Sequence, residues 1–307
     1  MMIMAVSLLL FAGCQSQPEK ETKEFGEDAV TFTDDMGREV TVEHPERVAC
    51  LIGSFADIWH LAGGTDSIVA TADDTWRYFD IPMKDDVVNL GKSKELNLEQ
   101  LLACEPDFVL ASCNTAENVE LVQAFDEMGL TVAYFEVTSI EDYLHMLEIC
   151  TEITGCTENY ETNGTAIMEQ VNAATEVVDG SRPRVLYVRA SGSSCKVKGS
   201  EGSVLGEMLA TLDCENIADS ETSLLENLSL EKIMEEDPEY IFVVMQSADP
   251  KEAEAVLEAT LLSQPAWNSL TAVKEGRYYV MDQTLYNLKP NAKWGKAYEE
   301  LAEILYK

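Results

Sequence analysis

The chain has 307 residues, of which 46% are hydrophobic and 25% charged, so it is a globular protein long enough for two domains. Its 21 lysines and arginines stand against 56 aspartates and glutamates, which gives a formal net charge of −35. That charge repels phosphate backbones and anionic lipid head groups, and it therefore argues against a nucleic acid as partner.

The first twelve residues form an apolar stretch in which Ser7 is the one polar residue, and Gly13 and Cys14 follow it. The stretch is too short to span a bilayer as a helix, and a short apolar segment closed by small residues is typical of an export signal. It resembles a bacterial lipoprotein signal, which implies that residues 1–13 are a signal peptide and that Cys14 is lipidated. A buried N-terminal strand is the alternative.

Residues 15–28 are rich in Glu, Lys, Gln and Ser and have little to bury. This composition is typical of a flexible tether, so residues 14–40 are predicted to be a tether and the segment that leads into the first lobe. We therefore expect an extracytoplasmic protein that contacts the cell membrane through its lipid anchor only.

Without Cys14, the chain has seven cysteines, an odd number that cannot all pair: Cys50, Cys104, Cys113, Cys150, Cys156, Cys195 and Cys214. The absence of a Cys-x-x-Cys motif argues against a zinc ribbon, a thioredoxin-type site and an iron–sulfur motif. Most of these cysteines lie in apolar runs. We therefore favour buried free thiols that pack as small hydrophobes over disulfides.

An internal repeat divides the chain into two halves. Residues 96–110 align without a gap with residues 228–242. In each copy an N-cap residue, Asn97 or Ser229, precedes apolar residues at helical spacing. A proline then ends the helix before a short apolar strand. Each copy is thus predicted to be a helix–turn–strand unit, and two such units predict two related lobes.

Buried strands alternate with amphipathic helices through the rest of the chain. The predicted strands are residues 47–52, 67–70, 108–111 and 132–135 in the first half, and residues 184–189, 240–245 and 278–281 in the second. Continuous apolar runs separated by helices indicate parallel sheets that are covered on both faces. The predicted fold class is therefore α/β, with an N-terminal lobe over residues 41–140 and a C-terminal lobe over residues 181–307, each a mainly parallel sheet flanked by helices.

Residues 141–180 are predicted to join the lobes as a long helix with one interruption near Gly155. Apolar residues recur there at helical spacing, and no Gly/Ser linker is present. A helical connector implies a stiff joint with little hinge motion. Residues 294–306 also have helical spacing and are expected to close the second lobe.

With these elements in place, the chain resembles the iron-siderophore, haem and cobalamin group of periplasmic binding proteins, the class III type with a rigid backbone helix between its lobes. The likeness is carried, in this order along the chain, by residues 45–50, 97–110, 183–188, 202–209 and 265–280. The resemblance implies a monomeric substrate-binding lipoprotein that captures a small-molecule metal complex and delivers it to an ABC permease with its ATPase. It also implies that the protein is no enzyme and has no cofactor, although the ligand itself can contain iron or cobalt.

The resemblance implies a ligand in the cleft between the lobes, where the carboxyl ends of parallel strands also favour a site on physical grounds. Ser54 is predicted to cap a helix after the first strand, with Phe55 beside it, and the free N–H groups of that helix could bind an anion. Trp76, Arg77 and Tyr78 follow the second strand and could stack on a flat ligand. The alternatives are a simple N-cap and packing of the aromatic residues against their own lobe.

From the second lobe, Arg189, Lys196 and Lys198 follow a strand end within ten residues, in a chain that is poor in cations. They are predicted to neutralise an anionic ferric complex, and a solvated basic loop is the alternative. Three further candidates follow the last predicted strand: Tyr286, Lys289 and Trp294.

The resemblance also implies that one acidic residue on each lobe docks onto arginines of the permease. Glu117 follows the first-lobe strand of the repeat, and Asp249 and Glu252 lie at or just beyond the equivalent place in the second lobe. A solvated helix start is the alternative for each. The docking candidates are therefore Glu117 and Glu252.

A relative that binds bare zinc or manganese would need several converging histidines, and the chain has only His44, His60 and His145. No direct metal site is therefore expected, and His60 is interpreted as a core histidine. An exported hydrolase is the rival from another class, but residues 53–57 lack the second glycine of a nucleophile elbow. Residues 199–206 fit neither a Walker loop nor a dinucleotide fingerprint.

A surface adhesin, the remaining rival, would have no small-molecule cleft. Aromatic residues together with cations favour a flat anionic iron complex, a ferric siderophore or haem, as the ligand. A corrinoid such as cobalamin is the alternative.

Overall fold

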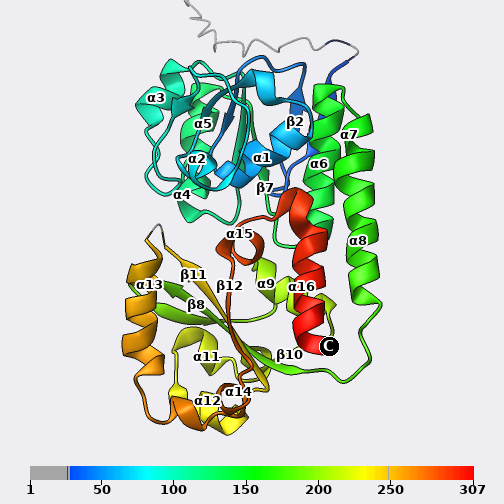
Figure 1. The fold of residues 1–307 in the computed structure, drawn as a ribbon. Helices are drawn as coiled ribbons and strands as arrows, with labels where there is room; N and C mark the ends of the chain where they lie inside the picture. The colour runs from blue at the N-terminus through cyan, green and yellow to red at the C-terminus, as the bar shows by residue number, and fades with distance from the viewer. Residues whose placement is uncertain (1–25, 27, 248) are drawn as a thin grey trace, which may run out of the picture.

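A computed structural model describes residue 26, residues 28–247 and residues 249–307 (Figure 1). The predicted signal peptide and the lipidation site at Cys14 lie outside the described residues. Figure 1 shows two lobes, with helices along one side that span both. Within the described ranges, every helix falls short of the length and apolar character needed to cross a bilayer.

The first lobe is built on a five-stranded parallel sheet. Its strands are β3 (Val48–Cys50), β4 (Ile68–Thr71), β5 (Val88–Asn89), β6 (Phe108–Ser112) and β7 (Val132–Phe135), in the order β5-β4-β3-β6-β7. Its helices are α1 (Gly53–Leu61), α2 (Asp74–Tyr78), α3 (Leu98–Ala103), α4 (Ala116–Val119) and α5 (Val122–Met128). Every residue of β3, β6 and β7 is buried, which is why these strands are continuous apolar runs in the sequence.

The second lobe repeats this plan. Its strands are β8 (Arg184–Ser191), β9 (Cys195–Lys198), β10 (Glu215–Asn216), β11 (Tyr240–Gln246) and β12 (Tyr278–Met281). The order β10-β8-β11-β12 is parallel, and β9 pairs antiparallel with β8. Its helices are α9 (Val204–Thr211), α10 (Ile217–Ser220), α11 (Ser223–Glu226), α12 (Leu230–Glu236), α13 (Pro250–Leu257), α14 (Thr271–Lys274) and α15 (Gln283–Tyr286). The predicted fold class is confirmed.

The internal repeat corresponds to equivalent units of the two sheets. Asn97 accepts a hydrogen bond from the Gln100 N–H at the start of α3, and Ser229 accepts one from the Lys232 N–H at the start of α12. The strands that follow these helices, β6 and β11, each pair with the first parallel strand of their own sheet. The predicted N-caps are therefore confirmed.

The connector is a pair of helices rather than one rod. A capping box of Ser139 and Asp142 starts α6 (Ile140–Thr154), which ends at Gly155 with φ +72°. The chain then reverses through α7 (Glu158–Tyr160) and a π-helical turn into α8 (Ala166–Thr175), and α8 lies along both lobes (Figure 1).

The C-terminal helix α16 (Trp294–Tyr306) packs along α8 rather than only closing the second lobe (Figure 1). A Cβ on Gly295 would come within 2.3 Å of Gln170 Oε1 of α8, so glycine permits this close approach. One continuous cluster of buried apolar side chains runs from the first-lobe sheet through α6, α8 and α16 to the second-lobe sheet. This shared core is a physical reason for a stiff joint between the lobes.

Residues that were assigned to the lead-in segment are structured as a hairpin. β1 (Val30–Thr33) and β2 (Glu39–Val42) pair antiparallel, and the Asp35 N–H donates to the Tyr134 carbonyl of β7. The hairpin therefore belongs to the first lobe. The seven described cysteines that were predicted to be free thiols are unpaired, and Cys50, Cys104, Cys150 and Cys214 are buried.

Candidate ligand-binding cleft

The strand order of the two sheets places the site. In the first sheet the chain runs from β3 outward to β4 and β5, and then returns to the other side of β3 as β6 and β7. In the second sheet it leaves β8 toward β10 on one side and continues with β11 and β12 on the other. Connections that leave neighbouring parallel strands in opposite directions open a crevice at the carboxyl ends of those strands. These ends are the ends of β3 and β6 in one lobe and of β8 and β11 in the other.

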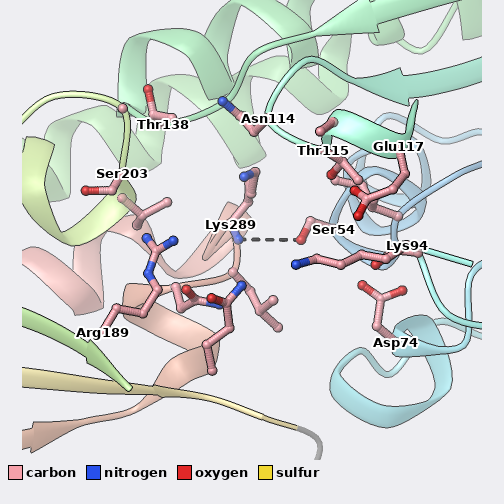
Figure 2. Close-up of a pocket in the computed structure, with 18 residues that line it drawn as sticks. Ser54, Asp74, Lys94, Asn114, Thr115, Glu117, Thr138, Arg189, Ser203 and Lys289 are labelled. Carbon is pink, nitrogen blue, oxygen red and sulfur yellow. Dashed lines mark hydrogen bonds between the residues drawn. The ribbon is translucent and has the colours of Figure 1, made fainter. Parts of the chain in front are cut away.

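A pocket of about 400 Å³ lies where these four strand ends face one another (Figure 2). Ile52 and Ser54 line it after β3, Arg189 lines it from β8, and Gln246 lines it from β11. A neighbouring pocket of about 600 Å³ shares Arg189 and Gln246 with the first and extends toward β9. We call these two pockets together the interlobe cleft, and its size suits a small molecule.

The cleft concentrates positive charge in a strongly acidic chain. Seven of the 21 lysines and arginines line it: Arg77, Lys92, Lys94, Arg189, Lys196, Lys198 and Lys289. Only three of the 56 acidic residues do so, namely Asp73, Asp74 and Glu117. A dissolved anion would therefore be attracted to this crevice, although the net charge of the whole chain is negative.

Most of these cations have no acidic partner. Arg77 is paired with Asp73 at 2.7 Å, and Lys92 lies 3.6 Å from Glu95. Among the described residues, the other five cleft cations make no ion pair within 4.0 Å. Their charge is therefore free to interact with a ligand.

The antiparallel pairing of β8 and β9 brings three cations, Arg189, Lys196 and Lys198, to one face of the second sheet. Arg189 lies opposite Lys196 in the antiparallel register, and Lys198 lies two residues further along β9. Like charges placed opposite each other on a sheet are destabilising. Burial, with repulsion from Arg189 and Lys196, lowers the pKa of Lys198. The guanidinium of Arg189 is held by donating to Tyr187 Oη at 3.2 and 3.3 Å.

Lys289 lies at the centre of the pocket, between Arg189 and Ser54 (Figure 2). Burial is the main cause that lowers its pKa to about 8, and repulsion from Arg189 acts in the same direction. Glu136 and Asp142 act weakly in the opposite direction. An unpaired and partly desolvated ammonium is a strong site for an anion, because a ligand that neutralises it removes an unfavourable charge.

The start of α1 differs from the prediction. Ser54 does not cap this helix, because α1 begins at Gly53 after Ile52 and has no side-chain cap. Instead, the Gly53 N–H donates to Asp74 Oδ1 at 3.0 Å, and burial raises the pKa of Asp74. A Cβ on Gly53 would lie 2.7 Å from the Thr75 backbone nitrogen, so the two helix starts approach closely only with glycine here. One donor at this helix start therefore binds the protein's own carboxylate.

The structure brings together many of the residues that were predicted to bind ligand. The predicted residues that line the cleft are Ser54, Arg77, Tyr78, Arg189, Lys196, Lys198 and Lys289. Four predicted residues do not line it. Phe55, Tyr286 and Trp294 are buried in the core at 0%, 1% and 0% exposure, while Trp76 is 46% exposed outside the pocket lining.

The predictions that Phe55, Tyr286 and Trp294 contact the ligand were wrong, and the physical reason is the same for all three. Phe55 turns to the sheet side of α1 and contacts Phe135 edge-on at 6.4 Å. Tyr286 donates its hydroxyl to the Ala297 carbonyl of α16, and Trp294 packs beside Tyr298 at 6.2 Å. Large aromatic side chains contribute most to stability when their apolar area is buried, and these positions offer that burial.

Several cleft residues had no signal in the sequence that we used. Lys92 and Lys94 follow β5, a two-residue strand too short to be recognised, and Gln246 ends β11. Asn114 and Ser203 come from loops that enter the pocket before α4 and α9. A search for cations after every short apolar run would have found the two lysines.

The helices that carry the two docking candidates, α4 and α13, lie on the side of the molecule opposite the connector helices (Figure 1). Glu117 is in the first turn of α4 and lines the cleft, and Glu252 is exposed in the first turn of α13. His60 lies outside the cleft lining, with Nδ1 2.7 Å from Thr65 Oγ1. No group of three or more His, Cys, Asp or Glu residues in the described part of the chain could hold a metal ion.

Comparison with known proteins gives a family and several relatives. The family model described as "Periplasmic binding protein" matches residues 48–285. The putative ABC transporter substrate-binding lipoprotein YhfQ of Bacillus subtilis is 21% identical over 305 residues, which cover 94% of this chain and 92% of the relative. A cobalamin-binding protein of Halobacterium salinarum is 29% identical over 234 residues, 74% of this chain and 61% of the relative.

Among solved structures, IsdE of Staphylococcus aureus complexed with heme superposes with a TM-score of 0.70 at 16% identity. The superposition covers 85% of this chain and 99% of that one. Similarity at this level of identity concerns the fold alone.

Proposed function

Because this chain belongs to the periplasmic binding protein family, whose model matches residues 48–285, we propose that it is the substrate-binding lipoprotein of an ABC importer. In this proposal it is anchored outside the cell membrane through Cys14 and captures an anionic iron complex in the interlobe cleft. It then delivers the complex to the permease and its ATPase, with Glu117 and Glu252 as the docking residues. The relatives that are named as binding proteins support a role in capture rather than catalysis.

One observation carries the choice of an anionic ligand. Five cations without acidic partners among the described residues converge on one crevice of a chain whose net charge is −35. Each hydrogen bond between such a cation and a ligand oxygen contributes about 1.5–3 kcal/mol, and an iron complex with several free carboxylates offers more anionic acceptors than a corrinoid of zero net charge. An iron complex with carboxylate or catecholate oxygens would use these donors.

The remaining lining favours a hydrophilic complex over haem. Serine, threonine, asparagine and glutamine side chains make up most of the other residues of the cleft. Among the described lining residues, Tyr78 is the only aromatic one, and neither histidine nor methionine is present. Haem needs an axial ligand and an apolar slot for its ring, and Tyr78 alone could serve as that ligand. A ferric siderophore of the carboxylate type therefore fits better than a porphyrin.

The test is a titration of the purified protein with ferric citrate, haem and cobalamin, followed by isothermal calorimetry and by quenching of its four tryptophans. Ferric citrate is expected to bind saturably, because its free carboxylates match the cleft cations. Gallium citrate is the redox-inert control and should bind equally, while citrate without metal should bind more weakly. Saturable cobalamin binding without binding of ferric citrate would contradict the proposal.

The affinity for ferric citrate is expected to depend on pH through Lys289. Its pKa is lowered to about 8, so the ammonium is charged below that pH and neutral above it. Lys198, whose pKa is also lowered, would act in the same direction. The affinity should therefore be highest below pH 8 and fall as the pH rises through it, by about five- to tenfold.

The measurement is the ratio of wild-type to Lys289→Gln affinity across this range. The titration of the ligand itself cancels in that ratio, because both proteins meet the same species. A ratio that stays constant with pH would show that Lys289 is not the titrating group.

A further inference from the structure

The segment that joins α15 to α16 crosses from the second lobe to the first. We call residues 286–291 the crossing segment. At one end, Tyr286 is 1% exposed and donates its hydroxyl to the Ala297 carbonyl at 3.1 Å. At the other end, Asn291 is 0% exposed and reaches α1 of the first lobe. Both ends of the segment are therefore fixed by buried side chains.

Asn291 makes two hydrogen bonds between the lobes. Its Nδ2 donates to the Ser54 carbonyl at 2.9 Å and to Asp57 Oδ2 at 2.8 Å. Burial raises the pKa of Asp57, and the hydrogen bond from Asn291 opposes that rise. Asn291 and its two partners are more than 230 residues apart in the sequence. This buried amide therefore ties the C-terminal part of the chain to the start of α1.

The backbone at Asn291 is also unusual. Its φ of +52° lies in the left-handed region, which asparagine tolerates better than most residues other than glycine. Backbone conformations of this kind cost free energy and persist where surrounding contacts enforce them. The two hydrogen bonds from Asn291 Nδ2 to α1 are among the contacts that hold this conformation.

Lys289 lies between the two anchors, two residues before Asn291 and three after Tyr286. Its backbone N–H points to Ser54 Oγ at 3.5 Å, and its side chain lies in the pocket beside Arg189 (Figure 2). Two positive groups placed side by side repel each other, so a free segment would let the lysine turn into solvent. Contacts of the crossing segment with the rest of the protein must therefore hold the lysine in the cleft.

We propose that Asn291 is a positioning residue that holds Lys289 in the interlobe cleft by tying the crossing segment to Ser54 and Asp57 of α1. The first lobe thereby sets where a cation of the second lobe meets the ligand. Binding benefits because the lysine is ordered before the ligand arrives. The effect on binding depends on the proposed function, whereas the position of Lys289 can be tested without any ligand.

The charged groups around Lys289 come from several elements. Arg189 of β8 repels it, and Glu136 after β7 and Asp142 of α6 attract it. Lys94, Asp74 and Glu117 of the first lobe line the same pocket. If the crossing segment is released, Lys289 moves away from Arg189 into water, and its pKa should rise from about 8 toward its ordinary value of 10.5.

The first variant is Asn291→Gly, because glycine accepts the positive φ and removes both side-chain hydrogen bonds; it also removes the buried amide and gives the backbone more freedom. The matched control is Asn163→Ala. Asn163 Nδ2 donates to the Leu61 carbonyl at the other end of α1, at 3.0 Å, but Asn163 does not line the cleft. Asp57→Ala serves as the second variant. It removes the acceptor of one of the two hydrogen bonds that Asn291 donates and leaves Asn291 itself unchanged.

The first readout is the pH dependence of acetylation of Lys289 in the ligand-free protein, measured by mass spectrometry. The midpoint is expected near pH 8 in the wild type and in Asn163→Ala, and at a clearly higher pH in Asn291→Gly. Asp57→Ala should move in the same direction by a smaller amount. Unchanged midpoints in both Asn291→Gly and Asp57→Ala would overturn the proposal.

The second readout is the affinity for ferric citrate. Asn291→Gly is expected to weaken it about three- to tenfold, and to have no further effect when Lys289→Gln is already present. A full additional loss in the double variant would overturn the positioning role. If the acetylation midpoint shifts while ferric citrate binds to no variant and not to the wild type, the positioning of Lys289 stands and the proposed ligand fails.

Discussion

Replacing Arg189 and Lys289 together with glutamine is expected to weaken binding of ferric citrate by about a thousandfold. Both side chains line the pocket, and neither has an acidic partner among the described residues. Each charge-assisted hydrogen bond contributes about 1.5–3 kcal/mol, so losing two of them removes several kcal/mol of binding free energy. Isothermal calorimetry at a pH below 8, where Lys289 is charged, measures the change.

The control is a double variant with the same change in net charge, Arg182→Gln with Lys296→Gln. The side chains of both residues are 62% exposed, and both lie outside the cleft. Surface charges at such positions contribute little in physiological salt, so the affinity should stay within about threefold of the wild type. Equal losses in the two double variants would mean that overall charge, rather than contact in the cleft, governs binding.

Asp34→Ala is expected to lower the free energy of unfolding by about 3 kcal/mol. The side chain of Asp34 is fully buried, where it accepts from the backbone N–H groups of Met36, Arg38 and Tyr134. It also accepts two hydrogen bonds from the Arg38 guanidinium, at 2.8 and 3.0 Å. Removing this carboxylate leaves the buried donors without their acceptor and weakens the attachment of the hairpin to β7. Urea denaturation, followed by tryptophan fluorescence, gives the free energy.

Asp126→Ala is the matched control, because Asp126 lies 3.6 Å from the same arginine but is 62% exposed. An exposed ion pair contributes at most about 1 kcal/mol, so this variant should be nearly as stable as the wild type. If Asp34→Ala and Asp126→Ala lowered the free energy of unfolding by the same amount, the buried hydrogen bonds of Asp34 would not be the cause of the hairpin's stability.

The regular elements could be predicted because their cause is local. β7 and β12 have the bounds that their apolar runs predict, residues 132–135 and 278–281. The N-caps Asn97 and Ser229 act on backbone groups three residues away, so the sequence pattern contains their whole interaction. The two-lobed α/β fold follows from these units, since parallel strands that are buried on both faces need helices around them.

Elements whose stability comes from distant residues could not be predicted in this way. β5 and β10 have two residues each and form only because a neighbouring strand is already in place. The β1–β2 hairpin depends on Asp34, whose partner Tyr134 is 100 residues away. Each of its strands has four residues with two apolar ones in alternation, VTFT and EVTV, and this pattern was too short to be recognised next to the polar segment before it.

For the binding site, the sequence by itself identified one group of cations, because Arg189 lies in a recognisable strand and Lys196 and Lys198 come soon after it. Only the tertiary structure decided that Lys94 joins them and that Phe55, Tyr286 and Trp294 turn into the core. It also decided that Asn291 reaches the start of α1. The physical reason is that the direction of a side chain on a helix or loop depends on which surface packs against it, and that surface comes from residues far away in the chain.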